Sequence, residues 1–481
     1  RSDFMETELK KTSPVSNDVK TKEFVFYLIG VFFYTTMTGM VGSYRQAYLI
    51  DSLFLSDNVV SQYNAFCSIS GFVLSFFYST IIDNRKIGKG GKFRPLVIYA
   101  AVPCGIFTVL TFITPKGLSG TWLFIYLITV AVLYGAATSF GNVINMVAVV
   151  MTPNHKERDK IMSFRSISSA IGNSAPLVII LVVGFFVKSA EWQYIVTASL
   201  CGVLGAVTMF FGMKCVKERI SYSAEKKNPL EGYGDVLKNK YAWTIIISEF
   251  LKNFRSIASY MGVFLAAALL GSKSKFLLFG LPTGIGTAVG MLVISMLLKK
   301  FNSKTLYIAS GIYSVIANTA AFAIGYTYFN HPSKVLQIVF IAFLFLIGLQ
   351  FGASNLLPSM FQADVLESLE LKTGKRLDAA LPFVIGIGTL ISGTIAQTLS
   401  PKILYGENSI IQYIQATEAN PNPEQSLKTK ILMLFFYTIF HGIMMFLAGV
   451  PFFFYKLTGK TKEEIHEQVL KNREEIAQKA E

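Results

Sequence analysis

Long apolar stretches separated by short polar connections dominate the chain. A helix that crosses a bilayer needs roughly 20 apolar residues, and twelve stretches approach or exceed that length. Most of them lack the polar face of a surface helix in a soluble protein. The pattern predicts an all-α membrane protein with twelve transmembrane helices. The expected spans are residues 24–50, 58–82, 95–114, 121–151, 161–187, 193–213, 242–270, 276–298, 305–327, 335–360, 379–400 and 431–456.

The Lys and Arg residues of the connections alternate between two sets of loops. The set containing residues 83–94 and 214–241 carries 21, whereas the other set carries 8. Because positive residues concentrate in cytoplasmic loops, we expect the first set on the cytoplasmic side. An even number of spans then places both termini in the cytoplasm. We expect the protein in the inner, or cytoplasmic, membrane of the cell.

The longest cytoplasmic connection falls between the sixth and seventh spans and divides the chain into two six-helix bundles. Such halves are the architecture of many secondary transporters. We expect five regions: an N-terminal segment (1–23), an N-terminal bundle (24–213), a linker (214–241), a C-terminal bundle (242–456) and a cytoplasmic tail (457–481). Residues 1–23 do not resemble a signal peptide, and we expect Met5 to be the first native residue.

Composition agrees with this assignment. Charged residues make up 15% of the chain, against about 25% in soluble proteins. The net charge of +15 is better explained by anionic membrane lipids than by nucleic acid, because the positive residues lie in loops between apolar spans. The four cysteines show no metal-ligand spacing. We therefore expect no metal, no cofactor and no nucleic-acid partner.

Several polar segments resemble motifs of one transporter family. Residues 83–95 read DNRKIGKGGKFRP, residues 151–158 read MTPNHKER, Arg165 lies in SFRS, and residues 362–376 read QADVLESLELKTGKR. In this order they resemble the melibiose-permease-like glycoside–pentoside–hexuronide:cation symporter family of the major facilitator superfamily. The resemblance covers about residues 20–470. It implies the major facilitator fold, alternating access and a sugar or glycoside as solute, with Arg165 contacting the solute.

The chain departs from this family at the expected cation site. No Asp or Glu occurs between Ser61 and Ile82 on the second span, where the family has two acidic residues. The family's other charged positions fall near Thr35, near Gly141 or Asn142, and near Leu390, which are uncharged here. A Na⁺ site needs hard oxygen ligands. We therefore expect transport without Na⁺, with H⁺ as a possible coupling ion.

Ionisable residues inside spans are candidates for function, because charge at membrane depth is costly. The seventh span carries Glu249, Lys252 and Arg255, whose spacing of three puts them on one side of a helix. We expect them at a cavity, with Glu249 as the coupling candidate. A structural ion network is the alternative. Arg45 either contacts the solute or snorkels to the interface, and Arg165 either contacts the solute or pairs with Asp159.

The remaining candidates are polar residues that either bind the solute or join helices. His441 on the twelfth span is expected to be peripheral, with a small chance of proton transfer. The expected solute-binding set is Thr35, Arg45, Asn142, Asn145, Arg165, Lys252, Arg255, Gln350 and Asn355.

Charged residues of two cytoplasmic loops form a second candidate group. Either they only follow the positive-inside rule, or they pair across the two halves as a latch for the outward-facing state. The expected latch residues are Arg85, Lys92, Arg94, Asp364, Glu367, Glu370, Lys375 and Arg376.

Three functions follow from this pattern, in decreasing order. The first is a monomeric secondary transporter of a sugar or glycoside. The second keeps the fold but carries an amphipathic or anionic solute, with Arg45, Lys252 and Arg255 as charge partners. The third, a membrane-embedded enzyme, is disfavoured because the four His residues are scattered and show no metal or catalytic spacing. A channel is disfavoured because no filter repeat occurs.

Overall fold

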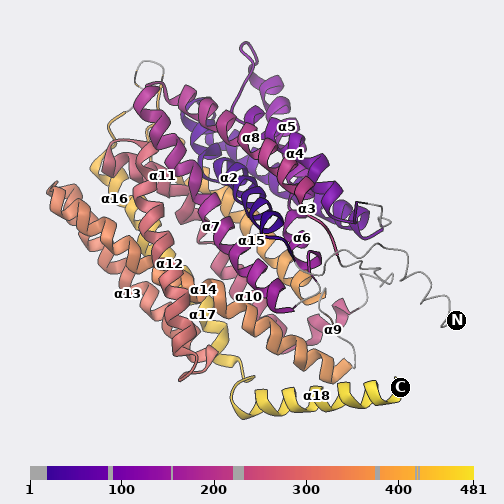
Figure 1. The fold of residues 1–481 in the computed structure, drawn as a ribbon. Helices are drawn as coiled ribbons and strands as arrows, with labels where there is room; N and C mark the ends of the chain where they lie inside the picture. Colours follow the sequence, from indigo (N-terminus) through magenta and orange to yellow (C-terminus); the bar gives the residue numbers. More distant parts are fainter. Residues whose placement is uncertain are drawn as a thin grey trace. The chain divides into compact units, whose positions relative to one another are not determined.

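A computed structural model of the protein describes residues 19–84, 90–152, 155–219, 232–373, 377, 380–417, 420 and 423–480. Helices account for most of these residues (Figure 1). In chain order they are α2 (Thr21–Asp51), α3 (Asp57–Asn84), α4 (Arg94–Leu110), α5 (Gly120–Gly141), α6 (Ile144–Val150), α7 (His155–Phe186), α8 (Ala190–Cys215), α9 (Tyr233–Lys238), α10 (Lys240–Asn253), α11 (Ser256–Leu270), η1 (Lys273–Phe276), α12 (Leu277–Leu297), α13 (Ser303–Asn330), α14 (Lys334–Thr373), α15 (Ala380–Leu404), α16 (Leu427–Phe435), the π-helix η2 (Phe436–Phe440), α17 (His441–Gly449), η3 (Val450–Phe454) and α18 (Lys460–Ala480).

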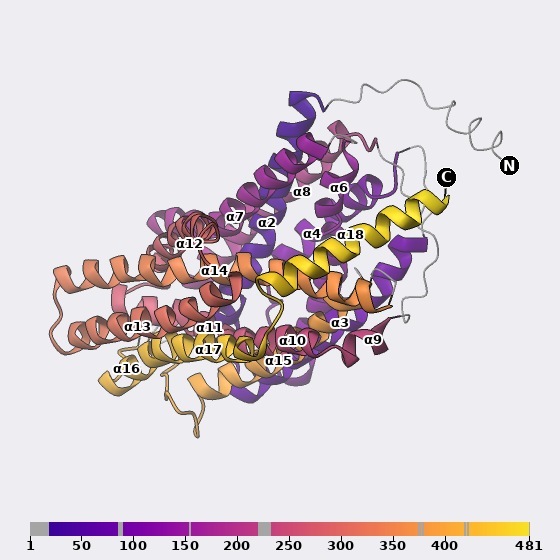
Figure 2. The same cartoon turned by 90° about the horizontal axis from the view of Figure 1, so that it is seen from below.

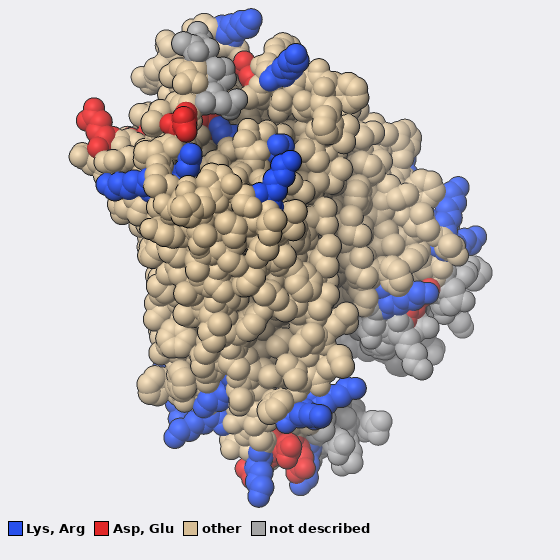
Figure 3. All heavy atoms as spheres, turned by 90° about the vertical axis from the view of Figure 1, so that its left-hand side faces the viewer, with Lys and Arg blue, Asp and Glu red and all other residues tan. Residues whose placement is uncertain are grey.

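These helices confirm the all-α membrane fold predicted from the sequence. Ten helical stretches within the described ranges are long and apolar enough to cross a membrane, and α4 is a shorter apolar helix. With α3, of 28 residues, they correspond to the twelve expected spans. Figure 3 shows one face of the molecule, on which drawn charged side chains lie at the top, at the bottom and at the right-hand edge of the view, and a broad uncharged band separates the top group from the bottom group. Such a band matches the hydrocarbon region of a bilayer.

Two compact units make up the chain. Unit 1 comprises Arg1–Arg45 and Ser70–Glu225, and unit 2 comprises Gln46–Ile69 and Lys226–Glu481. The division falls within the linker expected between the two bundles. It also assigns the end of α2 and the start of α3 to unit 2, which the sequence did not predict.

Glycines allow close backbone contacts between paired helices in each unit. In unit 1, a Cβ on Gly105 of α4 would lie 2.6 Å from the carbonyl oxygen of Gly202 on α8. In unit 2, a Cβ on Gly290 of α12 would lie 2.2 Å from the carbonyl oxygen of Leu349 on α14. Small residues permit such approaches, which drive helix association in membranes where the hydrophobic effect cannot.

Three spans are irregular along their length. The fourth and seventh spans tighten between α5 and α6 and between α10 and α11, where Val143 and Arg255 each donate a backbone hydrogen bond to the residue three positions earlier. The twelfth span contains the π-helix Phe436–Phe440 directly before His441. Tight turns and π-turns within helices often mark functional positions.

Candidate functional site

A chain of polar side chains lies on the irregular fourth span of unit 1. Arg165, on α7, donates from Nη1 to Oδ1 of Asn145 at 2.6 Å. Asn145 in turn donates from Nδ2 to Oδ1 of Asn142, also at 2.6 Å. Asn142 is exposed in the structure, and Arg165 is half-buried with a buried Nε that has no hydrogen-bond acceptor among the described atoms. The structure thus brings together three residues that the sequence named separately.

The other two unit 1 candidates differ from this group. The hydroxyl of Thr35 bonds to carbonyl oxygens of its own helix, those of Val31 and Phe32. Arg45 is half-buried near the end of the unit 1 part of α2. The alternative partner of Arg165, the side chain of Asp159, lies outside the described residues. Solute binding by Thr35 and Arg45 remains a prediction.

In unit 2, the three ionisable residues of the seventh span separate into a pair and a single charge. Lys252 donates from Nζ to Oε1 of Glu249 at 2.5 Å, and both side chains are largely buried. Arg255 lies at the tightened turn, with its guanidinium carbon 4.9 Å from the centroid of the Phe351 ring on α14. Its Nη1 is buried and has no hydrogen-bond acceptor within the described part of the chain. Glu249 and Lys252 together therefore carry no net charge, and the net positive charge of the three residues equals that of Arg255.

The same aromatic ring also contacts His441. The imidazole of His441 meets the Phe351 ring edge-to-face, with centroids 5.1 Å apart. His441 is 4% exposed, which corrects the expectation that it is peripheral. Neither Phe351 nor the burial of His441 was foreseen; the one available signal was an imidazole within a long apolar span.

The remaining unit 2 candidates are both on α14. Gln350 is buried and donates from Nε2 to the hydroxyl of Ser354 at 2.6 Å, while its Oε1 is buried without a described donor. Asn355 is exposed. Solute binding by these two residues also remains a prediction.

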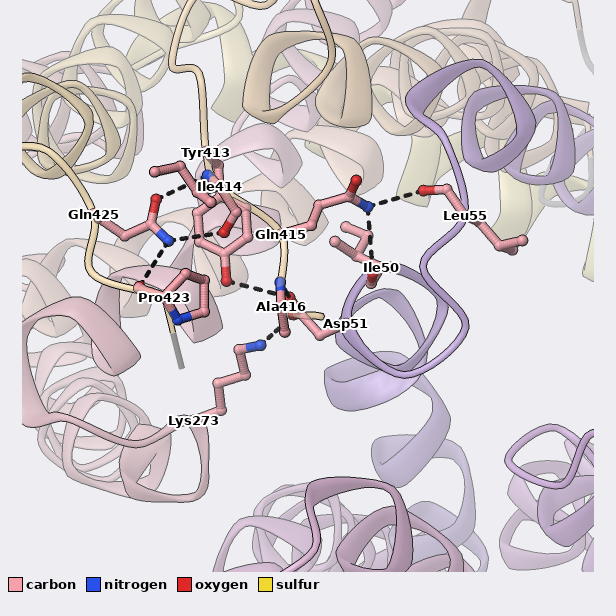
Figure 4. Close-up of polar contacts among 10 residues, drawn as sticks. All are labelled: Ile50, Asp51, Leu55, Lys273, Tyr413, Ile414, Gln415, Ala416, Pro423 and Gln425. Carbon is pink, nitrogen blue, oxygen red and sulfur yellow. Dashed lines mark hydrogen bonds and ion pairs between the residues drawn. The ribbon is translucent and has the colours of Figure 1, made fainter. Parts of the chain in front are cut away.

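A second polar group in unit 2, here called the Asp51 cluster, was not predicted (Figure 4). Asp51, the last residue of α2, accepts from Lys273 Nζ, from the Tyr413 hydroxyl at 3.3 Å and from the Ala416 backbone N–H at 3.3 Å. Gln415 donates from Nε2 to the carbonyl oxygens of Leu55 at 3.0 Å and Ile50 at 3.3 Å. The exposed fraction of the Asp51 side chain is 4% and that of Lys273 is 17%.

Further hydrogen bonds continue from the Asp51 cluster along the start of α3. The Tyr405 hydroxyl donates to the carbonyl oxygen of Leu55 at 3.1 Å. Ser61 donates to the carbonyl oxygen of Thr398, and Asn64 to that of Gln397. Burial, together with the nearby carboxylates of Asp57 and Asp51, raises the pKa of Tyr405 above its ordinary range. This hydroxyl therefore stays protonated and acts as a donor at neutral pH.

Several of the predicted latch residues have partners within their own units. The Arg94 side chain donates to the carbonyl oxygens of Met213 and Lys214. The Glu218 carboxylate accepts from three backbone N–H groups at the start of α4, those of Lys92, Phe93 and Arg94. Glu370 is half-buried. Arg85, Lys375 and Arg376 lie outside the described residues, and the latch stays a prediction.

Two carboxylates of the predicted latch, those of Asp364 and Glu367, contact side chains of the tail helix α18. Lys462 pairs with Asp364 at 2.7 Å, and Nδ1 of His466 lies 3.1 Å from Glu367. Figure 2 shows α18 crossing the end of α14. The sequence analysis predicted a tail here without a contact, and the structure adds this docking of α18 within unit 2.

The described residues contain no group of three His, Cys, Asp or Glu that could hold a metal ion. The guanidinium groups of Arg165 and Arg255 each have a buried nitrogen without a hydrogen-bond acceptor among the described residues. Such groups suit a solute rich in hydroxyl or anionic oxygens.

Comparison with known proteins identifies the class. The chain is 29% identical to the uncharacterized symporter YjmB of Bacillus subtilis, over 80% of this chain and 81% of that protein. It is 25% identical to the putative glycoside/cation symporter YagG of Escherichia coli, over 92% and 90% of the two chains. It is 24% identical to a putative sulfoquinovose importer of Salmonella typhimurium, over 81% and 80%.

Solved structures support the same fold. The inward-open xylose transporter XylE of E. coli superposes with a TM-score of 0.60 at 14% identity, covering 92% of this chain and 98% of that one. These relatives are named as symporters and an importer, in agreement with the secondary transporter expected from the sequence rather than with an enzyme. The family model described as MFS/sugar transport protein matches residues 26–459, and the chain therefore belongs to that family.

Proposed function

We propose that this transporter moves a sugar or glycoside, and that donors in its spans bind the solute's oxygens. The observation that carries the proposal is the hydrogen-bonded chain of Arg165, Asn145 and Asn142 at the irregular turn of the fourth span. Interrupted helices commonly form solute sites in secondary transporters. The putative glycoside/cation symporter YagG supports the same class of solute.

The proposed orientation places both termini in the cytoplasm and the Asp51 cluster on the outer face of the cytoplasmic membrane, with the protein acting as a monomer. Its basis is the uneven distribution of Lys and Arg between the two sets of loops. Single cysteines at Lys300, just before α13, and at Asn330, its last residue, provide the test. Asn330→Cys should react with an impermeant reagent added outside whole cells, and Lys300→Cys should not. The reverse result would invert the orientation.

The proposed coupling ion is H⁺ rather than Na⁺. The basis is the second span, which lacks a carboxylate from Ser61 to Ile82, whereas Na⁺ favours hard, charged oxygen ligands. Replacing Na⁺ by K⁺ on both sides of proteoliposomes should leave uptake unchanged, and a pH gradient should drive it. Uptake that requires Na⁺ would contradict this part of the proposal.

A second candidate solute is anionic. It is favoured by the buried Nη1 of Arg255, which lacks an acceptor among the described atoms, and by the named function of the putative sulfoquinovose importer. Uptake of radiolabelled methyl glucoside and of glucuronate into proteoliposomes compares the two candidates on rings of the same shape. Faster uptake of the glycoside supports the first candidate, and faster uptake of glucuronate the second. Uptake of neither would contradict both candidates.

A further inference from the structure

Arg255 and His441 share one aromatic neighbour deep in unit 2. The guanidinium carbon and the imidazole centroid lie 4.9 Å and 5.1 Å from the centroid of Phe351. The two groups are therefore no farther apart than the 10.0 Å that these distances add up to. Each also lies at an irregular point of its span, Arg255 at the tight turn after α10 and His441 directly after the π-helix.

Each of the two groups that contact this ring has a polar atom without a partner. Nη1 of Arg255 and Nε2 of His441 are buried, and neither has a hydrogen-bond partner within the described ranges. Buried polar atoms are normally paired, so a cluster without partners calls for water, an ion or a ligand. In the neutral imidazole that carries its hydrogen on Nδ1, Nε2 holds a lone pair that can accept a proton.

The three ionisable residues of the seventh span keep a net positive charge. Glu249 acts electrostatically on Arg255, but it is also paired with Lys252. The other titratable groups within the membrane on the elements packed against α17 are the hydroxyls of Tyr307 and Tyr313 on α13 and of Tyr437 in the π-helix. These phenols are neutral at physiological pH. Arg255 is thus the charge that opposes a proton on His441.

We propose that His441 binds the coupling proton and Arg255 binds an anionic group of the solute, so that each binding event favours the other. The inference rests on the proposed transport function and selects its anionic candidate. An anion on Arg255 offsets the positive charge near the imidazole, and Nε2 then takes a proton from water. The protein carries the anion and the proton together, and both leave on the other side, so that charge and atoms balance. Such mutual favouring is a coupling free energy between two sites.

The first test needs no solute. Substituting His155, His331 and His466 by Gln leaves His441 as the single imidazole, whose titration can be followed by NMR in lipid nanodiscs. Two unit charges 10 Å apart at an effective dielectric constant of about 20 shift a proton equilibrium by about one pH unit. Arg255→Gln should therefore raise the titration midpoint of His441 by about one unit or more. Arg255→Lys, which keeps the charge, should leave it nearly unchanged. An unchanged midpoint in Arg255→Gln would overturn the proposal.

The second test measures proton uptake on binding to the full chain. Calorimetry in two buffers of different ionisation enthalpy, with glucuronate as probe, should give a net uptake of protons, which for a midpoint shift of about one unit reaches at most about half a proton per glucuronate at a pH close to the His441 midpoint. His441→Gln should abolish the uptake, and methyl glucoside should cause none. Glucuronate binding without proton uptake, or uptake that persists in His441→Gln, would refute the assignment. Binding of methyl glucoside but not glucuronate would refute the anion site.

If neither probe binds, the proposed solute class fails, and the midpoint of the single imidazole still decides whether Arg255 controls a proton on His441.

Discussion

Replacing Asp51 by Asn should open the Asp51 cluster. Asn keeps an oxygen for Tyr413 and for the backbone N–H of Ala416, but it removes the charge that pairs with Lys273. Removing one partner of a buried ion pair costs about 3–5 kcal/mol. Lys273 retains 17% exposure and lies 5.5 Å from the Phe264 ring centroid, so we expect a loss of about 2–3 kcal/mol, below that range.

Cysteine labelling measures this loss directly. Val60 on α3 is fully buried and belongs to the segment that the cluster holds in unit 2. In a background without the four native cysteines, Val60→Cys should react with an impermeant reagent only when the segment opens. A loss of 2–3 kcal/mol raises the open fraction roughly 30- to 150-fold, and the labelling rate should rise by that factor in Asp51→Asn.

Two variants control the experiment. Glu407→Gln removes an exposed carboxylate in the loop after α15 that also carries Tyr413, and it should change the labelling rate of Val60→Cys little. Adding Lys273→Met to Asp51→Asn removes the stranded charge and should recover most of the loss, since replacing both partners of a buried pair is often near neutral. A labelling rate that stays at the unsubstituted level in Asp51→Asn, or an equal rise in Glu407→Gln, would refute the reasoning.

Three further substitutions test packing, the latch and helix bending. Gly290→Ala places a methyl group 2.2 Å from the carbonyl oxygen of Leu349 and should destabilise unit 2 by about 1–3 kcal/mol in thermal unfolding. The control Gly386→Ala, whose added Cβ has nothing within 4 Å, should leave the stability unchanged. Equal effects of the two substitutions would count against tight packing at Gly290. Arg376→Ala should slow transport more than it weakens binding if the predicted latch exists, and equal losses would place Arg376 at the solute. A Cβ added at Gly42 on α2 has nothing within 4 Å, and alanine stiffens a helix relative to glycine. If α2 bends during transport, Gly42→Ala should lower the uptake rate and leave the binding affinity of the solute unchanged.

The apolar pattern predicted the spans well because every backbone group in a bilayer must be paired within its own helix. It also singled out Arg165, Asn142 and Asn145, since polar residues inside apolar stretches stand out individually. Their direct hydrogen bonds could not be foreseen, because they depend on how α7 lies against the fourth span. Phe351 gave no signal at all, since one phenylalanine among 41 looks like any lipid-facing or core side chain.

The Asp51 cluster illustrates a different limit. In the sequence, Asp51 is an ordinary polar residue at the end of a span, and its partners Lys273 and Tyr413 lie 222 and 362 positions away. The chain from Tyr405 to Gln425 reads as a loop, yet Tyr405, Tyr413 and Gln415 form hydrogen bonds with residues 50–55, at the end of α2 and just after it. Only the tertiary fold brings these residues together, because no local periodicity relates them.

The Asp51 cluster also explains why the division into units does not follow the chain. The boundary between the two units passes through α2 between Arg45 and Gln46, and through α3 between Ile69 and Ser70. Both helices are continuous across these points, so local helical structure cannot assign the segment between Gln46 and Ile69 to unit 2. Bonds from Asp51 and Leu55 to Lys273, Tyr413 and Gln415 make that assignment. The labelling of Val60→Cys therefore measures how much of the segment's attachment to unit 2 depends on the Asp51 charge.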